Sequence, residues 1–218
     1  MISCSAWQLY VIIDRTAVGV RGMASVAAGA IRGGADVIQL RDKGASVREL
    51  MREAHALLPI TRRAGIPLMI NDRADVVLAV GADGVHLGQD DLPIQVARQL
   101  LGPDRFIGCS THSLEQALAA EREGADYLGC GPVFPTPTKP NYASVGTHLI
   151  AEVTARVHIP VVCIGGIEAG NVTDVLQAGG RCVAVVRAVC GAQDPQAAAM
   201  LLKRAIVQFT RSTKTATL

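Results

Sequence analysis

Eight short apolar runs, rich in Val, Ile and Leu, recur along the 218-residue chain and restrict what it can fold into. Near-continuous apolar runs are typical of strands buried on both faces, as in a parallel sheet covered by helices. The predicted strands are residues 9–13, 37–40, 67–70, 84–87, 106–109, 127–130, 161–164 and 182–186.

Amphipathic or Ala-rich stretches separate these runs. The predicted helices are residues 23–32, 46–64, 74–80, 93–101, 113–123, 147–157, 171–177 and 195–209. Ser46 before Glu49 and Ser113 before Gln116 are helix start signals. Strands alternating with helices in this way predict one α/β domain over residues 1–218, a (β/α)8 TIM barrel. The alternative is a doubly wound open sheet, but no GxGxxG turn follows the first strand.

A Gly-Ala-Asp tripeptide occurs at 34–36, 81–83 and 124–126, each time between a predicted helix and the next predicted strand. Gly and Asp are frequent in turns, so we interpret the repeat as turn chemistry at the starts of strands. The same turn is expected three times in one barrel.

Composition excludes several functions. The net charge of +2 and the 3% aromatic content provide neither a basic stripe nor a stacking platform for nucleic acid. No apolar run is long enough for a membrane span, and the N-terminus does not resemble a signal peptide, so we expect a cytoplasmic protein without a membrane partner. The six cysteines show no CxxC pairing, and the four that lie inside apolar runs are interpreted as small core residues. The sequence leaves the oligomeric state open, and a homo-oligomer is compatible with it.

Polar residues follow the predicted strands, where a barrel builds its site. For strands two to eight they include Gln39, Arg41, Lys43, Asn71, Asp72, Gln89, Asp90, Asp91, Ser110, Thr111, Thr136, Thr138, Lys139 and Arg187, with Gly165, Gly166 and Val186 beside them. Three cations, Arg41, Lys43 and Lys139, suffice to neutralise a diphosphate. Asp72 and Asp91 suit a hydrated Mg²⁺ that also binds phosphate oxygens.

Each of these assignments has an alternative. Arg41 and Asp42 could form a simple surface ion pair, and Asp72 could cap the following helix. His86 ends the fourth predicted strand and is interpreted as a hydrogen-bonded core or rim histidine.

The stretch 129–145 contains prolines at 132, 135 and 137, which exclude a helix interior or central strand, so it is predicted to be a loop. Thr136, Thr138 and Lys139 make it suitable for an anion, most simply a phosphate. Gly165, Gly166 and the turn after the eighth strand would present backbone N–H groups to a second phosphate.

Several segments together resemble the thiamine-phosphate synthase family. They are IQLRDK (38–43), INDRADVVLAVGADGVHLGQDDLP (70–93), IGCSTHSLEQA (107–117), GPVFPTPTKP (131–140) and IPVVCIGGI (159–167). The resemblance implies a (β/α)8 barrel that acts as a transferase in thiamine biosynthesis. Its small-molecule substrates would be 4-amino-5-hydroxymethyl-2-methylpyrimidine diphosphate and a thiazole phosphate, and its products thiamine phosphate and diphosphate.

The resemblance also implies roles for individual residues. It assigns the pyrimidine diphosphate to Gln39, Leu40, Arg41, Asp42, Lys43, Asn71, Ser110 and Lys139, among which Arg41, Lys43, Ser110 and Lys139 would be catalytic. It assigns Mg²⁺ to Asp72 and Asp91, and the thiazole phosphate to Thr136, Pro137, Thr138, Gly166, Val186 and Arg187. The family often has Ser where this chain has Arg187, which leaves the role of that side chain open.

The implied mechanism needs no nucleophilic side chain, because the thiazole nitrogen attacks a pyrimidine methylene cation formed when diphosphate leaves. Two alternatives are a thiazole tautomerase and a non-catalytic phosphate-binding barrel. The tautomerase has no need of Asp72, Asp91 or the three cations, so their presence argues against it. The non-catalytic barrel would bind thiazole phosphate without releasing diphosphate.

Overall fold

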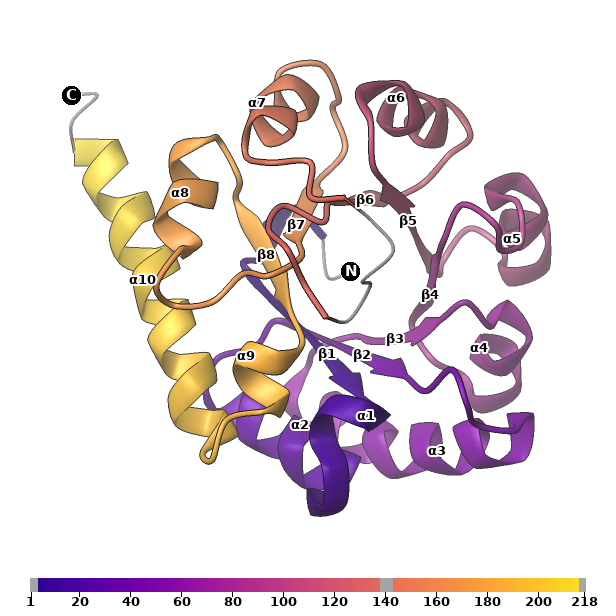
Figure 1. Ribbon diagram of the computed structural model, residues 1–218. Coiled ribbons are helices and arrows are strands. Elements are labelled where there is room, and N and C mark those ends of the chain that lie inside the picture. The colour runs from indigo at the N-terminus through magenta and orange to yellow at the C-terminus, as the bar shows by residue number, and fades with distance from the viewer. Residues whose placement is uncertain (1–3, 138–142, 216–218) are drawn as a thin grey trace.

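Eight parallel strands close into a barrel in the computed structural model, which describes residues 4–137 and 143–215 (Figure 1). Each strand pairs with its neighbours in sequence, and β1 pairs with β8. The strands are β1 (Leu9–Asp14), β2 (Val37–Arg41), β3 (Leu68–Asn71), β4 (Gly84–Leu87), β5 (Phe106–Thr111), β6 (Tyr127–Cys130), β7 (Val161–Ile164) and β8 (Cys182–Val185). The predicted (β/α)8 barrel is therefore confirmed.

The helices form the outer ring of the barrel in Figure 1. The predicted ones are α2 (Met23–Arg32), α3 (Val47–Ala64), α4 (Ala74–Val80), α5 (Ile94–Leu101), α6 (Leu114–Arg122), α7 (His148–Thr154), α8 (Val172–Gln177) and α10 (Pro195–Thr215). Ser46 and Ser113 cap α3 and α6 as predicted, and Ser46 forms a reciprocal capping box with Glu49. Within the described ranges, no helix combines the length and the apolar character that crossing a membrane requires.

Four short elements were not predicted from the sequence. They are α1 (Arg15–Val18), α9 (Arg187–Cys190) and the 3-10 turns η1 (Cys4–Ala6) and η2 (Gly19–Arg21). Each is a single turn, too short to show the 3.6-residue apolar period on which helix prediction depends. Both α1 and α9 directly follow the carboxyl end of a strand, so they lie at the rim where the site is expected.

The apolar residues form two layers. Along β1, Leu9, Val11 and Ile13 face the helices, while Tyr10 and Ile12 face the barrel interior. An aromatic cluster fills the interior at the amino ends of the strands, with the Trp7 ring 5.2 Å from Phe106 and 5.3 Å from Tyr127, both edge-on. The barrel is therefore plugged at this end, and open space remains toward the carboxyl ends.

The repeated Gly-Ala-Asp turns share one hydrogen-bond pattern. Asp36 donates its backbone N–H to Leu9 O and accepts the Leu9 N–H on its carboxylate, both at 2.8 Å. Asp83 makes the same reciprocal pair with Leu68, and Asp126 makes it with Ile107. Each aspartate thus extends the parallel ladder by one rung at the amino end of a strand, which explains why the tripeptide recurs there.

All six cysteines are free, and five of them are buried. Burial raises the pKa of the Cys109 thiol to about 11 and that of Cys130 to about 12. These thiols stay protonated near neutral pH and behave as small core residues, as predicted.

Candidate functional site

A cavity of about 370 Å³ opens at the carboxyl ends of the strands. Its wall includes the predicted site residues Gln39, Arg41, Asn71, Ser110, Thr136, Pro137, Gly166, Val186 and Arg187. Asp42, Lys43, Asp72 and Asp91 lie outside this wall, and Leu40 has its side chain buried against the helices, which leaves it only a backbone contact to offer. The predicted residues Thr138 and Lys139 fall outside the described residues.

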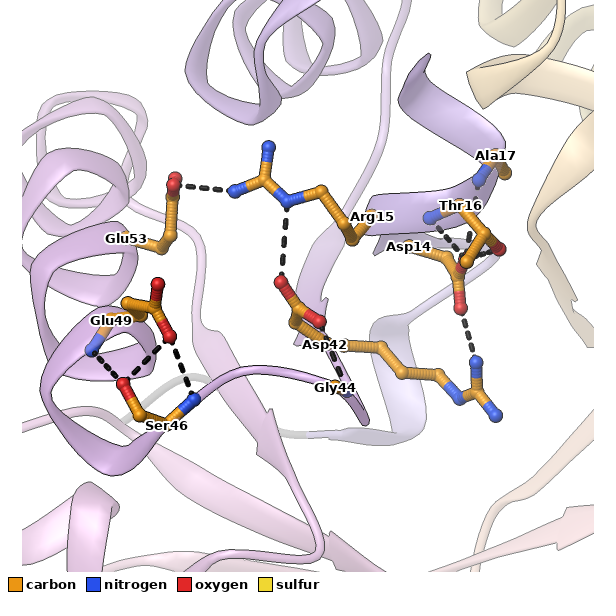
Figure 2. Close-up of polar contacts among 10 residues, drawn as sticks. Asp14, Arg15, Thr16, Ala17, Asp42, Gly44, Ser46, Glu49 and Glu53 are labelled. Carbon is orange, nitrogen blue, oxygen red and sulfur yellow. Dashed lines mark hydrogen bonds and ion pairs between the residues drawn. The ribbon is translucent and has the colours of Figure 1, made fainter. Parts of the chain in front are cut away.

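Arg41 is held by an aspartate that the strand-end analysis did not include. Asp14 ends β1, is 2% exposed, and accepts a hydrogen bond from the Arg41 guanidinium. Its other oxygen accepts from Thr16 N at 3.0 Å and Ala17 N at 3.2 Å, which caps α1 (Figure 2). Burial alone would raise the pKa of Asp14, but hydrogen bonds from Thr16 and Arg41 outweigh it and lower the pKa below its ordinary value.

Arg41 and Asp42 do not form the surface ion pair that was the alternative interpretation. Arg41 pairs with Asp14. Asp42 instead pairs with Arg15 at 3.2 Å, as Figure 2 shows. The two neighbouring side chains point to different partners, as successive residues at the end of a strand do.

Lys43 and the two predicted metal ligands lie beside the cavity. Lys43 Nζ is 3.0 Å from Asp72 Oδ2, and the Asp72 carboxyl neighbours that of Asp91. Burial and the neighbouring Asp91 carboxyl raise the pKa of Asp72. Lys43 lowers it, but by less, so the pKa stays above its ordinary value. Asp72 does not cap α4, whose N-cap is Arg73. It has a φ of 64°, a left-handed conformation that is rare outside Gly but tolerated by Asp and Asn.

The pair Asp72 and Asp91 fits a hydrated Mg²⁺. Two adjacent carboxylates repel, so their ionised pair favours a cation between them. In the described part of the chain, no cluster of three or more His, Cys, Asp or Glu side chains could hold a metal. A cation bound here would therefore draw its other ligands from water and substrate, as Mg²⁺ commonly does.

The proline-rich segment forms one wall of the cavity. Gly129 and Cys130 end β6, so the prediction of a loop from residue 129 was wrong for these two, and it is confirmed for residues 131–137 and 143–145. Backbone hydrogen bonds join Val133 N to Ile164 O at 2.8 Å and Phe134 N to Gly165 O at 3.0 Å. A Cβ atom added at Gly165 would lie 2.5 Å from Pro132, and one added at Gly166 would lie 2.7 Å from Phe134. The glycines after β7 therefore let the two loops pack backbone to backbone.

A chain of hydrogen bonds crosses the barrel below the cavity. Gln39 Nε2 donates to Tyr10 OH at 2.8 Å, and Tyr10 OH lies 3.1 Å from Tyr127 OH. His86 links Tyr127 OH to Ser110 Oγ through its two ring nitrogens, at 3.0 and 2.9 Å. Burial raises the pKa of both tyrosines, which keeps the phenols neutral. The chain therefore connects Gln39 and Ser110 from opposite sides of the cavity.

Sequence reasoning missed Asp14 and His112 in this region and did not place His86 in the site. Asp14 could have been found by applying the strand-end rule to the first strand as well. His86 is hydrogen-bonded, as interpreted, but it also lines the cavity. His112 lines the cavity too and contacts Gly131 O, and no sequence pattern indicated it.

Comparisons with known proteins agree on one family. The profile of the family described as "Thiamine monophosphate synthase" matches residues 9–189. A thiamine-phosphate synthase of Chloroflexus aurantiacus is 50% identical over 206 residues, covering 94% of each chain, and one of a Roseiflexus species is 47% identical over 199 residues, covering 91% of this chain and 84% of the relative.

Solved structures show the same similarity. A thiamine phosphate pyrophosphorylase from Pyrococcus furiosus superposes with a TM-score of 0.85 at 40% identity, covering 93% of this chain and 96% of the other. An N-acetylmannosamine-6-phosphate 2-epimerase from Clostridium perfringens, at a TM-score of 0.64 and 17% identity over 92% of each chain, shares the fold alone.

Proposed function

The chain belongs to the thiamine monophosphate synthase family, and on that premise we propose how its residues carry out the transferase reaction of thiamine biosynthesis. In the proposed reaction, diphosphate leaves the methylene carbon of 4-amino-5-hydroxymethyl-2-methylpyrimidine diphosphate. The ring nitrogen of a thiazole phosphate then forms the new bond to that carbon. The products are thiamine phosphate and diphosphate.

Arg41 and Lys43 would bind the diphosphate together with Lys139. Arg41 lines the cavity, and Lys43, two residues beyond the end of β2, lies beside it and contacts Asp72. Breaking the C–O bond builds negative charge on the departing diphosphate, and fixed cations stabilise that charge without reorganising during the reaction. Lys139 is assigned by sequence, since it lies outside the described residues.

Asp72 and Asp91 would hold Mg²⁺ beside these cations. When bound, the ion would neutralise part of the charge on the diphosphate and fix its orientation. Lys43 contacts Asp72 at 3.0 Å, so the same lysine would connect the metal site to the anion site.

The cavity interior would receive the pyrimidine ring. Gln39, Asn71 and Ser110 line it with amide and hydroxyl groups. His86 contacts Ser110 Oγ, and Tyr10 contacts Gln39, so two of these groups are held in place by the buried hydrogen-bond chain. Groups that are already ordered lose little conformational entropy when the substrate binds.

Thr136, Pro137 and Thr138 from the proline-rich loop would bind the thiazole phosphate, together with Gly166 and the Val186–Arg187 turn. The described members of this set also line the cavity, from the loops that follow β6, β7 and β8. An exposed Arg187 at the start of α9 would add a charge-assisted contact to the backbone N–H groups there. The two anionic substrates would then meet above the ring-binding groups.

The observation that carries the proposal is the grouping of Arg41, Lys43, Asp72 and Asp91 beside one cavity. The test is steady-state release of diphosphate by the purified protein with both substrates, with each substrate alone, and with Mg²⁺ removed by a chelator. We expect release only when both substrates and Mg²⁺ are present, with equimolar formation of thiamine phosphate. Binding of thiazole phosphate without release of diphosphate would instead identify a non-catalytic barrel.

Lys139→Ala supplies the matching test of the loop. Loss of this cation should lower turnover by about 10²-fold or more while the protein stays folded. Arg156→Ala is a suitable control, because Arg156 forms an exposed helix pair with Glu152 at 3.9 Å, away from the cavity. Wild-type turnover in the Lys139→Ala variant would refute its role.

A further inference from the structure

Two dipeptides whose charges run in opposite order face each other where β1 and β2 end. Asp14 is in register with Arg41 in the parallel pair, so Arg15 stands beside Asp42. The sequence Asp-Arg therefore lies against Arg-Asp, and both cross-strand contacts are made, Asp14 with Arg41 and Arg15 with Asp42. Each strand end supplies the counter-charge that the other one needs.

The inner contact fixes the guanidinium that lines the cavity. Asp14 cannot rotate without giving up its bonds to Thr16 N, Thr16 Oγ1 and Ala17 N, which cap α1. Its second oxygen is thereby aimed at Arg41, which uses Nη1 for this contact. A guanidinium carries five N–H donors, so the remaining ones stay available for an anion.

The outer contact fixes the segment that leads from Arg41 to Lys43. Arg15 Nη2 bonds to Glu53 of α3 at 2.5 Å, and Arg15 Nε bonds to Asp42 Oδ2 at 3.2 Å (Figure 2). Asp42 Oδ1 in turn accepts from Gly44 N at 3.2 Å. Asp42 thus faces away from the cavity wall and is bound on both oxygens to protein groups.

We propose that Asp14 and Arg15 are positioning residues for the diphosphate, Asp14 through Arg41 and Arg15 through Asp42 and the adjoining Lys43. In this arrangement Asp42 acts through Arg15 and does not touch the substrate. The inference rests on the proposed function, because it assumes that Arg41 and Lys43 bind the diphosphate. It adds two residues to the site and gives Asp42 a role different from the contact that family resemblance assigns to it.

A double-mutant cycle on the outer pair tests the proposal. We would measure kcat and the KM of each substrate for wild type, Arg15→Gln, Asp42→Asn and the double variant. Each single change should raise the KM of the pyrimidine diphosphate about tenfold, the effect of a small misplacement of a binding group, and leave the KM of the thiazole phosphate unchanged. The double variant should be no worse than either single one, since both changes break the same contact.

The inner pair is tested with inorganic diphosphate as the probe, by calorimetry in the presence of Mg²⁺. Asp14→Asn should weaken its binding about tenfold, because the neutral amide no longer orients Arg41. In an Arg41→Gln background the same Asp14→Asn change should have no further effect. Equal losses in both backgrounds would overturn the role of Asp14.

Arg98→Gln is the matched control. Arg98 pairs with Asp126 at 2.6 Å in a half-buried contact like that of Arg15, but at the amino ends of the strands. It should lower the melting temperature and change neither KM.

In the cycle on the outer pair, an Arg15→Gln, Asp42→Asn double variant whose KM for the pyrimidine diphosphate rises by the product of the single effects would show that Asp42 touches the substrate. That result would overturn the inference.

Failure of the inference and failure of the proposed function are distinguishable. A wild-type protein that releases no diphosphate from the two substrates refutes both. An active wild type with an Arg15→Gln variant of unchanged KM, or with both KM values raised equally, refutes the positioning role alone.

Discussion

The two rims of the barrel use aspartate in opposite ways. At the amino rim, Asp36, Asp83 and Asp126 each accept a backbone N–H and return one from their own backbone. Two of these aspartates also pair with cations on the outer helices, Asp36 with Lys203 and Asp126 with Arg98. At the carboxyl rim, Asp14 and Asp72 contact the cations Arg41 and Lys43, which come from the end of β2 and the residues just beyond it. One set completes the ladder, and the other set holds charges beside a cavity.

The difference shows what separates a stabilising carboxylate from a functional one in this fold. A backbone N–H is always present, so an aspartate that extends the strand ladder keeps that bond whatever else it contacts. A pair of side chains can exchange partners when an anion or a metal arrives. Asp72 has the features of a functional carboxylate, because its backbone is left-handed and its pKa is raised by burial and by Asp91. Substitutions at the amino rim should therefore change stability, and those at the carboxyl rim should change activity.

The largest expected effect is on activity. Asp72→Asn should lower turnover by about 10²-fold or more, because a neutral amide is a poor Mg²⁺ ligand. Asn tolerates the φ of 64° at this position, so the melting temperature should stay within a few degrees of wild type. Diphosphate release and thermal unfolding measure the two quantities on the same preparation.

Asp83→Asn is the control at the opposite rim, and it should retain wild-type turnover. If Asp72→Asn keeps full activity, or if it loses activity only because the protein unfolds, the assignment of Asp72 to the metal site is wrong.

A smaller effect, on stability alone, is expected for Asp36→Ala. This change leaves the N–H groups of Gln8 and Leu9 without their acceptor and removes the partner of Lys203, which lies 2.6 Å from Asp36. The loss of unfolding free energy should be about 2–3 kcal/mol, as for other charged hydrogen-bonded groups. Urea denaturation measures it, and kcat should not change below the unfolding transition.

Asp83→Ala should lose less stability than Asp36→Ala at the same rim. Asp83 is exposed and accepts the Leu68 N–H at 2.8 Å, so its loss should be nearer 1 kcal/mol. Equal losses for the two variants would show that the second N–H and the lysine contribute nothing. A fall in kcat would show that the amino rim is coupled to the site.

The sequence was sufficient to predict the eight strands and all helices longer than one turn, because buried parallel strands leave near-continuous apolar runs and Gly and Ser mark the helix ends. It also predicted many of the residues that line the cavity, since strand order fixes where strand ends meet, although Asp42, Lys43, Asp72 and Asp91 lie outside its wall. It could not predict the partners. The pairing of Arg41 with Asp14, and not with Asp42, depends on strand register. The series of hydrogen bonds that links Gln39 to Ser110 joins residues that only closure of the barrel brings together.

The smallest expected effect is the pH dependence of the stability that Asp14 contributes at the carboxyl rim. Hydrogen bonds from Thr16 and Arg41 outweigh burial and depress the pKa of Asp14, so the ionised carboxylate stabilises the fold. This contribution should be fully present above about pH 4, the ordinary aspartate pKa, and should be lost as the pH falls through the depressed native value. The stability difference between wild type and Asp14→Asn, measured by urea denaturation, should therefore be constant above that pH and shrink below it. A difference that stays constant down to about pH 2 would mean that the charge of Asp14 adds nothing to folding, and that its pairing with Arg41 serves the site alone.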